Sequence, residues 1–453
     1  MIAAKYQAYK ESGIPWIGSL PAHWETVPYK HLVDIQNGAD HKHIEQAEGY
    51  PVIGSGGVFA NASEFIYEGD SVLLGRKGTI DKPLFVSGRF WTVDTMYWTK
   101  IAQDANPRFA YYTALTIPFD YYATNTALPS MTKSVLHAHL VARPPKLEQA
   151  AIAAFLDRET AKIDSLVEEQ RRLIELLKEK RQAVISRAVT KGLNPNVSMK
   201  DSGVEWLGKV PAHWQPIQLG RVCRQVSDGP HFSPQYVDDG VMFLSARNLG
   251  VDSWHLEDAK FVSEVDYLEF SKRVIPELGD VLYTKGGTTG IARVVDLPMR
   301  FQVWVHIAVL KLDRTKSDPY FMAYALNSVG CHEQSQLSTR GATNQDLGLT
   351  RMIRIWFALP PLTEQRVIAA WLSSETHRID ALVVESEAAL SLLQERRAAL
   401  ISAAVTGKID VRDSTDLLAA WAETKADIAA GRFVSESAKA HVARARAMAK
   451  RDD

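Results

Sequence analysis

The feature of this 453-residue sequence that most limits its possible folds is an internal duplication. The stretch GIPWIGSLPAHW, from Gly13 to Trp24, returns 190 positions later as GVEWLGKVPAHW, from Gly203 to Trp214. Seven of the twelve positions are identical. Solenoid units are roughly 20 to 50 residues long, so a period near 200 residues indicates a duplicated domain. The histidine before each repeated tryptophan is expected to make a structural hydrogen bond.

A second repeat, with an offset of 216 residues, predicts a long helix in each half. PPKLEQAAIAAFLDRETAKIDSLV from Pro144 returns as PPLTEQRVIAAWLSSETHRIDALV from Pro360. RQAVISRAVT from Arg181 returns as RAALISAAVT from Arg397. Because the two offsets differ by 26 residues, the second half is longer between its repeats. The halves have therefore diverged in the middle.

Each helix is predicted to run from a Pro-Pro pair to a glycine, over about 47 residues or roughly 70 Å. Pro145 and Pro361 suit the first turn, and Gly192 and Gly407 suit the C-terminal end. Apolar residues recur every seven positions, as in a coiled coil, and so long a helix needs a partner, most simply its own copy. The predicted seam is Leu156, Ile163, Gln170, Leu177 and Val184 in the first helix and Leu372, Ile379, Ser386, Leu393 and Leu400 in the second, with Leu166, Val167, Leu173, Ile174, Leu382, Val383 and Leu390 between them. The two polar members allow either a buried pair that fixes register or a solvated gap.

Residues 25–143 and 215–359 differ in kind from the helical segments. They contain short β-branched or aromatic runs, such as SVLLG, GVMFLS, DVLYT and FQVWVHIAVLKL, separated by Gly, Asp, Asn and Pro turns. PRFAYYTALT and PYFMAYALNS predict one helix in each stretch. The expected fold class is α+β, with two strand-rich domains and two long helices.

Composition excludes several classes of protein. With 46% hydrophobic and 23% charged residues, the chain is expected to form ordinary cores. It has no run of 18 apolar residues and no secretory signal, so a cytoplasmic protein without a membrane partner is expected. Cys223 and Cys331 form no metal-binding spacing. The net charge of −1 does not by itself favour nucleic acid as a partner.

Sequence signatures of catalysis are missing. There is no GxxxxGK[ST] phosphate loop, no Asn/Asp-Pro-Pro-aromatic tetrapeptide and no GxGxxG motif. His41 and His43 have no further ligands at metal-binding spacing, and Glu423 and Lys425 lack the rest of a nuclease motif. These observations favour a binding or scaffolding protein over an enzyme.

One glycine-rich loop recurs in both variable stretches. Gly69 and Asp70 lead into a strand followed by GRKGTI, and Gly279 and Asp280 lead into a strand followed by TKGGTTG. Glycines that allow close approach of the backbone, combined with Arg, Lys and Thr, suit phosphate and groove contacts. A plain β-turn with a solvated lysine is the alternative.

With these motifs the sequence resembles the specificity subunits of Type I restriction-modification enzymes, over residues 11 to about 412. The resemblance is carried by the SGxxWxGxxPAHW openings, the PPxxEQ helix starts, the IDxL within each helix, and the endings AVTKGL and AVTGKI. The second variable stretch adds DGPHFSP and GVMFLSARNL, which are also typical of the family.

The resemblance implies two target-recognition domains held apart by an antiparallel pair of coiled-coil helices, with a pseudo-twofold internal repeat. Each domain would read one half of an asymmetric, bipartite target in double-stranded DNA. Two methyltransferase subunits would dock on the helical spacer, and restriction subunits would complete the complex. S-adenosylmethionine, ATP and Mg would then belong to partners, so this chain is expected to be non-catalytic and to hold no cofactor or metal. The expected limits are 1–143 and 196–359 for the recognition domains, 144–195 and 360–412 for the helical spacers, and 413–453 for a helical tail.

The candidate DNA contacts are polar residues in the glycine loops and before each Pro-Pro pair, with His231 of DGPHFSP as a further possibility. Arginine suits guanine, and Asn or Gln suits adenine, in the major groove. For each residue a capping or turn role is the alternative. The paired Glu-Gln residues that start the helices are caps or partner contacts. The candidate DNA contacts are Arg76, Lys77, Thr79, Asn125 and Ser130 in the first domain, and His231, Lys285, Thr288, Thr289, Arg340, Asn344 and Gln345 in the second.

Two other classes of function compete with this interpretation. A stand-alone nuclease or phosphoryl-transfer enzyme would need an acidic metal cluster near the glycine loops, where the sequence offers only Asp70 or Asp280. A pure oligomerisation scaffold would not need two diverged domains. Exchange of residues 25–143 separates the readings, because it should change half of a DNA target and have no effect on a scaffold.

Overall fold

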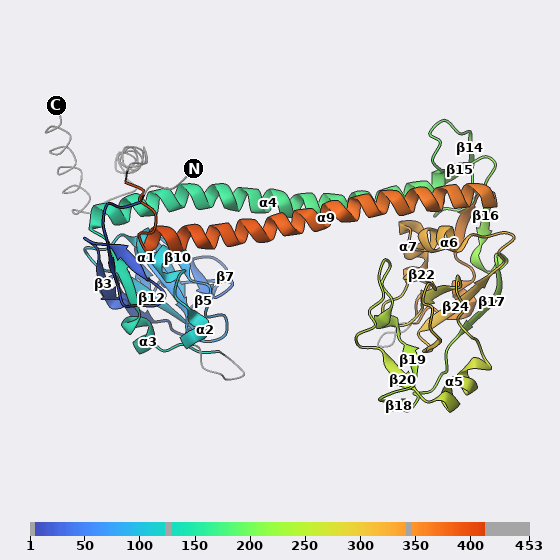
Figure 1. Cartoon of the computed structure of the whole chain (residues 1–453), viewed down its shortest axis with the longest axis horizontal. Coiled ribbons are helices and arrows are strands. Elements are labelled where there is room, and N and C mark those ends of the chain that lie inside the picture. The colour runs from blue at the N-terminus through green and yellow to red at the C-terminus, as the bar shows by residue number, and fades with distance from the viewer. Residues whose placement is uncertain (1–4, 123–128, 341–345, 413–453) are drawn as a thin grey trace. The chain divides into compact units, whose positions relative to one another are not determined.

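The computed structural model describes residues 5–122, 129–340 and 346–412, and their contacts form two compact units. Unit 1 comprises residues 1–170 and 389–453, and unit 2 comprises residues 171–388. Each unit contains one strand-rich head and a segment of each long helix (Figure 1). Asn125, Asn344, Gln345 and the tail from residue 413 lie outside the described residues.

The two long helices have the bounds that the sequence predicts. Helix α4 spans Lys146–Lys191, directly after the first Pro-Pro pair, and α9 spans Leu362–Val405 after the second. Gly192 and Gly407 follow the helix ends with φ of +72° and +73°. This left-handed conformation satisfies the last carbonyl groups of a helix and favours glycine.

In unit 1, the segments of α4 and α9 run antiparallel. Leu156 of α4 shares an apolar cluster with Val405 of α9. Further along α4, Asp164 pairs with Arg397 at 2.7 Å. Moving towards the C-terminal end of α4, its contacts on α9 move towards the N-terminal end of that helix.

The same order holds in unit 2. Arg181 of α4 binds Asp380 of α9 at 2.8 Å, and later in α4 Ile185 shares a cluster with Ile368. Arg181 also binds Asp252 of the second head at 2.6 Å. The helix pair in this unit is thus held both by apolar packing and by an ion pair that continues into the head.

Burial along the helices follows the predicted seam only in part. Leu166, Leu173 and Leu382, which the sequence pattern places beside the seam, are 45%, 42% and 38% exposed. That part of the prediction is wrong, because a seven-residue repeat buries only a narrow stripe of each helix. The buried seam residues are Leu156, Ile163, Leu177, Leu372, Ile379 and Ser386; Gln170, Val184, Leu393 and Leu400 are half-buried.

The first head contains a four-stranded sheet of order β10-β9-β12-β4 and a five-stranded sheet of order β5-β7-β6-β11-β8. Only β6 and β11 pair in parallel; the other neighbours are antiparallel. Separate ladders join β1 to β2 and β3 to β13. The elements are β1 (Tyr9–Glu11), β2 (Ser19–Pro21), β3 (Glu25–Pro28), η1 (Tyr29–His31), β4 (Val33–Asn37), β5 (Glu45–Gln46), β6 (Tyr50–Gly54), β7 (Gly57–Ala62), β8 (Tyr67–Glu68), β9 (Ser71–Gly75), β10 (Leu84–Val86), β11 (Arg89–Thr92), β12 (Met96–Ile101), α1 (Pro107–Ala114), α2 (Phe119–Tyr122), α3 (Lys133–Ala138) and β13 (Leu140–Arg143).

The second head repeats this plan. Its sheets have the orders β17-β24-β21-β22 and β18-β20-β19-β23, and the one parallel pair, β19 with β23, corresponds to β6 with β11. Ladders join β14 to β15 and β16 to β25. The elements are β14 (Met199–Asp201), β15 (Lys209–Pro211), β16 (Gln215–Gln218), η2 (Leu219–Arg221), β17 (Cys223–Asp228), β18 (Tyr236–Val237), β19 (Val241–Leu244), η3 (Ala246–Asn248), β20 (Lys260–Val262), α5 (Glu264–Ser271), β21 (Val281–Thr284), β22 (Ala292–Val294), β23 (Phe301–Val303), β24 (Ile307–Leu312), α6 (Pro319–Leu326), α7 (Val329–Ser338), α8 (Leu349–Met352) and β25 (Trp356–Leu359).

The repeated His-Trp and Glu-Gln motifs meet at the start of each long helix. In unit 1, fully buried Trp24 donates from Nε1 to Glu148 Oε2 at 2.9 Å, and His23 Nε2 lies 2.7 Å from Glu148 Oε1. Gln149 Oε1 accepts the backbone N–H of Asn106, the N-cap residue of α1, at 2.8 Å. These bonds fasten the first turn of α4 to the head.

Unit 2 uses the same contacts with one difference. His213 Nε2 lies 2.8 Å from Glu364 Oε2, and Gln365 Oε1 accepts the backbone N–H of Asp318, the N-cap residue of α6, at 2.8 Å. Trp214 is also fully buried, but its Nε1 has no hydrogen-bond partner among the described residues. The structural role that the sequence assigns to the histidines is confirmed.

The described residues contain no helix that is both long enough and apolar enough to cross a membrane. Across the same residues, no group of three or more His, Cys, Asp or Glu side chains has the arrangement of a metal site.

Candidate nucleic-acid interface

In the first head, main-chain hydrogen bonds hold the glycine loop that follows β9. The backbone N–H of Arg76 donates to the Thr95 carbonyl oxygen at 2.9 Å. The N–H of Gly78, which has a φ of +82°, donates to Pro129 O at 2.9 Å. Lys77 forms a β-bridge with Ser130, so the loop adjoins the polar stretch before the first Pro-Pro pair. Two candidate segments that lie about 50 residues apart in sequence are thus side by side.

The second head builds the same frame after β21. The backbone N–H of Lys285 donates to His306 O at 2.8 Å, and Gly286 forms a β-bridge with Asp346. Gly287 has a φ of +74° and corresponds to Gly78. Because the frame is made by the backbone, it recurs although the side chains differ.

The candidate side chains in these loops differ in accessibility. Arg76 is half-buried, with its guanidinium carbon 6.0 Å from the centre of the Tyr97 ring, and Nη1 donates to Asp94 O at 3.2 Å. Ser130 is also half-buried. The exposed candidates are Lys77, Thr79, His231, Thr288 and Arg340.

Lys285 and Thr289 lie inside the second head. Lys285 is 4% exposed, and its Nζ lies 2.8 Å from Asp346 Oδ1 and 3.4 Å from Asp228 Oδ2. Thr289 is 2% exposed and its Oγ1 accepts a hydrogen bond from Gln336 Nε2 at 3.0 Å. These contacts make both side chains supports of the loop, and a direct contact with DNA would require them to leave their partners.

A charged cluster at the end of β17 includes residues that the sequence pattern does not single out. Asp228, the first residue of DGPHFSP, is buried and binds both Lys285 and Arg273. Asp346 accepts a hydrogen bond at its backbone oxygen from Arg351 Nη2 at 2.9 Å. Arg273 follows α5 and carries no sequence signal, because its link to Asp228 spans 45 positions and depends on the folded sheet.

His306 lies beside this cluster, against Gly286 of the loop. Its pKa is lowered, first because it is removed from solvent and then because Lys285 is close. A Cβ atom on Gly286 would lie 2.1 Å from His306 Nδ1, so any larger residue here would displace the His306 ring or the loop. The imidazole is therefore held neutral and in contact with the loop backbone.

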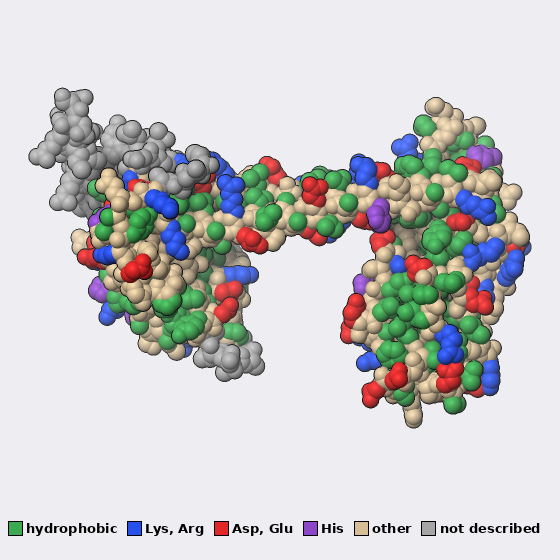
Figure 2. Space-filling model, viewed as in Figure 1, with side chains coloured by type: hydrophobic (Ala, Val, Ile, Leu, Met, Phe, Trp, Pro, Cys, Tyr) green, Lys and Arg blue, Asp and Glu red, His purple; other side chains and the backbone are tan. Residues whose placement is uncertain are grey.

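The surface charge fits the near-zero net charge of the sequence. On the face of each head that Figure 2 shows, basic and acidic side chains are interspersed. On this face, local hydrogen-bonding groups rather than a broad basic field are available for recognition.

Comparison with known proteins relates both halves of the chain to one family. Residues 21–176 and 214–383 each match the family described as "Type I restriction modification DNA specificity domain". The chain is 24% identical over 294 residues to the Type I restriction enzyme MjaVIII specificity subunit of Methanocaldococcus jannaschii, with 64% of this chain and 66% of that protein covered. It therefore spans slightly less than two thirds of that relative's length.

A bacterial relative is covered more fully. The chain is 22% identical over 450 residues to the Type I restriction enzyme EcoBI specificity subunit of Escherichia coli, with 93% and 92% of the two chains covered. It also resembles a chain solved in a study titled "Structural basis underlying complex assembly and conformational transition of the type I R-M system". That likeness has a TM-score of 0.61 and 18% identity, and covers 85% of this chain and 98% of the other. At such identity it shows a shared fold.

Proposed function

The chain belongs to the family of Type I restriction modification DNA specificity domains, and from this premise we propose that it reads a bipartite DNA target. Each head reads one half-site, through the glycine loop and the segment paired with it. The observation that carries the proposal is the recurrence of one loop frame with different side chains, Arg76 and Lys77 in one head and Lys285 and Gly286 in the other. Because the two loops share one backbone arrangement but carry different side chains, the two half-sites differ in sequence and the target is asymmetric.

In this proposal the expected domain limits stand, with recognition domains at 1–143 and 196–359. The helical segments 144–195 and 360–412 act as a coiled-coil spacer, related by a pseudo-twofold axis, that sets the separation of the half-sites. For a protein with two reading elements, the geometry between them fixes the spacing of the half-sites on DNA.

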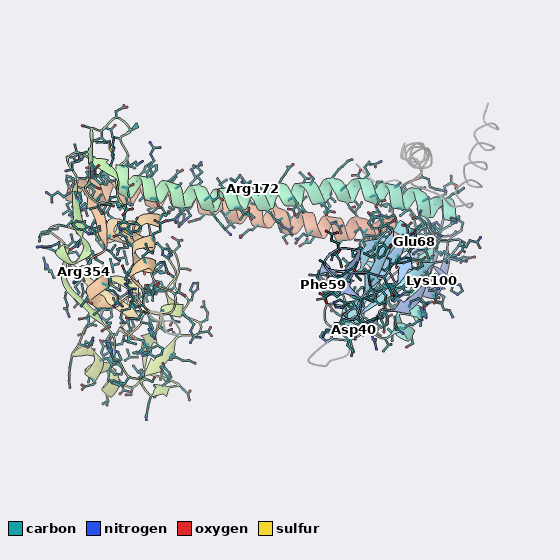
Figure 3. The ribbon with its side chains drawn as sticks, turned by 180° about the vertical axis from the view of Figure 1, so that it is seen from behind. Asp40, Phe59, Glu68, Lys100, Arg172 and Arg354 are labelled. Carbon is teal, nitrogen blue, oxygen red and sulfur yellow. The ribbon has the colours of Figure 1, made fainter. Side chains whose placement is uncertain are left out.

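The exposed faces of the long helices support docking of methyltransferase subunits. In unit 2, Leu173 and Leu176 of α4 are 42% and 43% exposed, and Val384 of α9 is 65% exposed. Arg172, labelled in Figure 3, lies beside them on α4 and pairs with Glu175. Aliphatic groups outside a helix's buried stripe mark an interaction surface. In unit 1, Leu166 of α4 and Leu392 of α9 are 45% and 64% exposed. One such surface in each unit gives two methyltransferase positions.

Docking is tested by copurification of the tagged chain with the methyltransferase subunit encoded beside it. Leu173→Glu together with Leu176→Glu is expected to reduce the recovered methyltransferase at least tenfold. Leu268→Glu is the matched control, because Leu268 is 58% exposed but lies on α5 of the head. If both variants recovered equal amounts of methyltransferase, the exposed leucines of α4 would not be the docking surface.

Partner subunits supply the chemistry in this proposal. S-adenosylmethionine would bind the methyltransferases, and ATP and Mg would act in the restriction subunits, while this chain is a non-catalytic specificity subunit. In the described residues the glycine loop of the second head adjoins Asp228 and Asp346, but both carboxylates are bound to cationic side chains. That arrangement favours a reading role over a metal-dependent nuclease.

The test is adenine-methylation mapping by long-read sequencing, in cells that express this chain with its methyltransferase and in cells that lack only this chain. An asymmetric two-part motif is expected only when the chain is present. Exchange of residues 25–143 for those of another family member should then change one half of the motif. The same methylation pattern with and without the chain, despite soluble expression of both proteins, would favour a scaffold instead.

A further inference from the structure

The strongest unassigned feature in the structure is the arrangement around Asp228 in the second head. Asp228 ends β17, and its side chain is 3% exposed. It accepts a hydrogen bond at Oδ1 from Arg273 Nη2, and Arg273 Nε donates to its backbone oxygen at 2.8 Å. Lys285 lies on the other carboxylate oxygen at 3.4 Å. A buried carboxylate with two cationic partners has one fixed orientation, and it fixes the arginine in turn.

The two bonds to Asp228 use only one edge of the guanidinium. They engage Nε and one hydrogen of Nη2, while Nη1 has no partner among the residues that the structure describes. The Arg273 side chain is 47% exposed, so its free end faces solvent. Nη1 and the second hydrogen of Nη2 are parallel donors at that end.

His231 leaves this free end available. Its Nε2 lies 3.3 Å from Asp228 Oδ1 and 3.3 Å from Arg273 Nη2. In the tautomer that carries its proton on Nε2, His231 donates to Asp228, because the carboxylate is the stronger acceptor. An imidazole nitrogen that donates cannot also accept, and Nη2 therefore keeps its second hydrogen.

We propose that Arg273 reads a guanine of the DNA half-site bound by the second head, with Asp228 as its positioning residue. This inference rests on the proposed function and specifies its chemistry. Two parallel N–H donors from an arginine match the O6 and N7 acceptors of guanine in the major groove. A side chain held by a buried partner keeps the geometry that such a contact needs.

A phosphate oxygen is the other acceptor that fits an arginine fork. The charge of Arg273 is already opposed by the buried carboxylate of Asp228, which weakens its attraction to a phosphate. A neutral base edge is recognised by donor geometry rather than by net charge, so this arrangement favours guanine.

The guanine requirement should be confined to one half-site. In the first head only the two-residue strand β8 lies between β7 and β9, whereas the second head has α5 and the Arg273 turn between β20 and β21. The first-head residue at the position of Asp228 is Asn37, since Asn37 faces Tyr97 as Asp228 faces Ala308 in matching ladders. The first head thus lacks both the arginine and its carboxylate.

The test maps adenine methylation with Arg273→Ala and Arg273→Lys in the otherwise complete chain, expressed with its methyltransferase. Both variants are expected to raise methylation about tenfold at sites that differ from the wild-type motif only at one guanine. Lysine keeps the charge but loses the fork, so it should not restore discrimination. The half-site read by the second head is identified as the one that persists when residues 25–143 are exchanged. The Arg273 variants should leave the other half-site unchanged.

Arg224→Ala is the matched control, because Arg224 lies on β17, the strand that ends in Asp228, is 62% exposed and binds the carboxylate of Asp313. It should leave the motif unchanged. Uniformly weaker methylation with Arg273→Ala that Arg273→Lys restores would assign a phosphate contact and overturn the proposal. A second half-site without guanine, or a motif unaffected by soluble Arg273→Lys chain, would also overturn it. If wild-type chain gives no two-part motif at all, the proposed function itself fails.

Discussion

Arg76 follows strand β9 in the first head, and Lys285 follows the equivalent strand, β21, in the second. Their side chains nevertheless lie in different environments. Arg76 is half-buried beside the Tyr97 ring, and its guanidinium donates to the backbone oxygen of Asp94 at 3.2 Å. Lys285 is buried between the carboxylates of Asp228 and Asp346. Backbone hydrogen bonds fix both loops, so the side chains are free to diverge without loss of the frame. One duplicated fold thus presents a different set of side chains in each head.

The largest effect on stability is expected from a substitution that breaks the buried cluster of Asp228, Lys285 and Asp346. Asp228→Ala leaves Lys285 buried with one carboxylate fewer, which should lower the free energy of unfolding by about 3 kcal/mol. Asn37→Ala, the equivalent change in the first head, removes an exposed side chain and should stay within about 0.5 kcal/mol. Urea unfolding followed by tryptophan fluorescence measures both, and equal losses would show that the heads do not differ in this way.

A smaller effect is expected from the loop backbone. Gly286→Ala places a Cβ atom 2.1 Å from His306 Nδ1, so the ring or the loop must move, at a cost of about 2 kcal/mol. Lys77→Ala is the matched change at the same ladder position of the first head, where the side chain is exposed. It should be neutral for stability. Thermal unfolding compares them, and a stable Gly286→Ala chain would argue against close packing of His306.

The repeated tryptophans allow a direct comparison of the helix anchors. Trp24→Phe loses the bond to Glu148 as well as part of the ring, whereas Trp214→Phe loses no hydrogen bond to a described residue. Trp24→Phe should therefore cost about 1 kcal/mol more in free energy of unfolding. The pair of denaturation curves gives the difference, and a larger loss for Trp214→Phe would contradict it.

A pH-dependent loss of stability is expected from His139. Burial lowers its pKa to about 4; its ring stacks on Trp16 and its Nδ1 bonds the Tyr122 hydroxyl at 3.0 Å. In the unfolded chain the pKa returns to about 6.5, so protons bind the unfolded state first as pH falls. Stability should decline from about pH 6.5 towards 4.

The second head has Ile355 at the position of His139, since both carbonyl oxygens accept the first N–H of the matching 3-10 helix. His139→Gln should therefore flatten the pH dependence of the unfolding free energy in the whole chain. An unchanged pH profile would assign the dependence to other groups, such as His306, whose pKa is also lowered.

Part of the fold follows from local pattern. The Pro-Pro starts, the glycine ends and the helices at Pro107–Ala114 and Pro319–Leu326 were all predictable from residue type, because caps and helix periodicity act over a few positions. Strand partners were not predictable. The apolar run FQVWVHIAVLKL forms β23 and β24, which turn apart at Trp304 and enter different sheets. Nothing local tells one apolar run which neighbour each part will meet.

The candidate interface divides in the same way. Its glycine loops are evident from sequence, because close backbone approach needs glycine wherever the loop folds. The sequence shows that the segments at Ser130 and Asp346 both precede a Pro-Pro pair. It does not show that each of them pairs with a glycine loop. The burial of Lys285 and Thr289 could not be anticipated, because a lysine in a turn is normally solvated, and only the arrival of Asp228 and Asp346 makes burial of the ammonium favourable.

The sequence by itself determined that this protein is a duplicated α+β chain with two long helices, because those features depend on repeats and local periodicity. It also pointed to the family, through motifs whose contacts fasten the helix starts to the heads. The tertiary structure alone decided which leucines leave the seam and which polar residues support the loops rather than face outward. It also decided that Arg273, 45 positions from Asp228, is bound to that carboxylate. Those outcomes depend on long-range contacts, which have no period in the sequence.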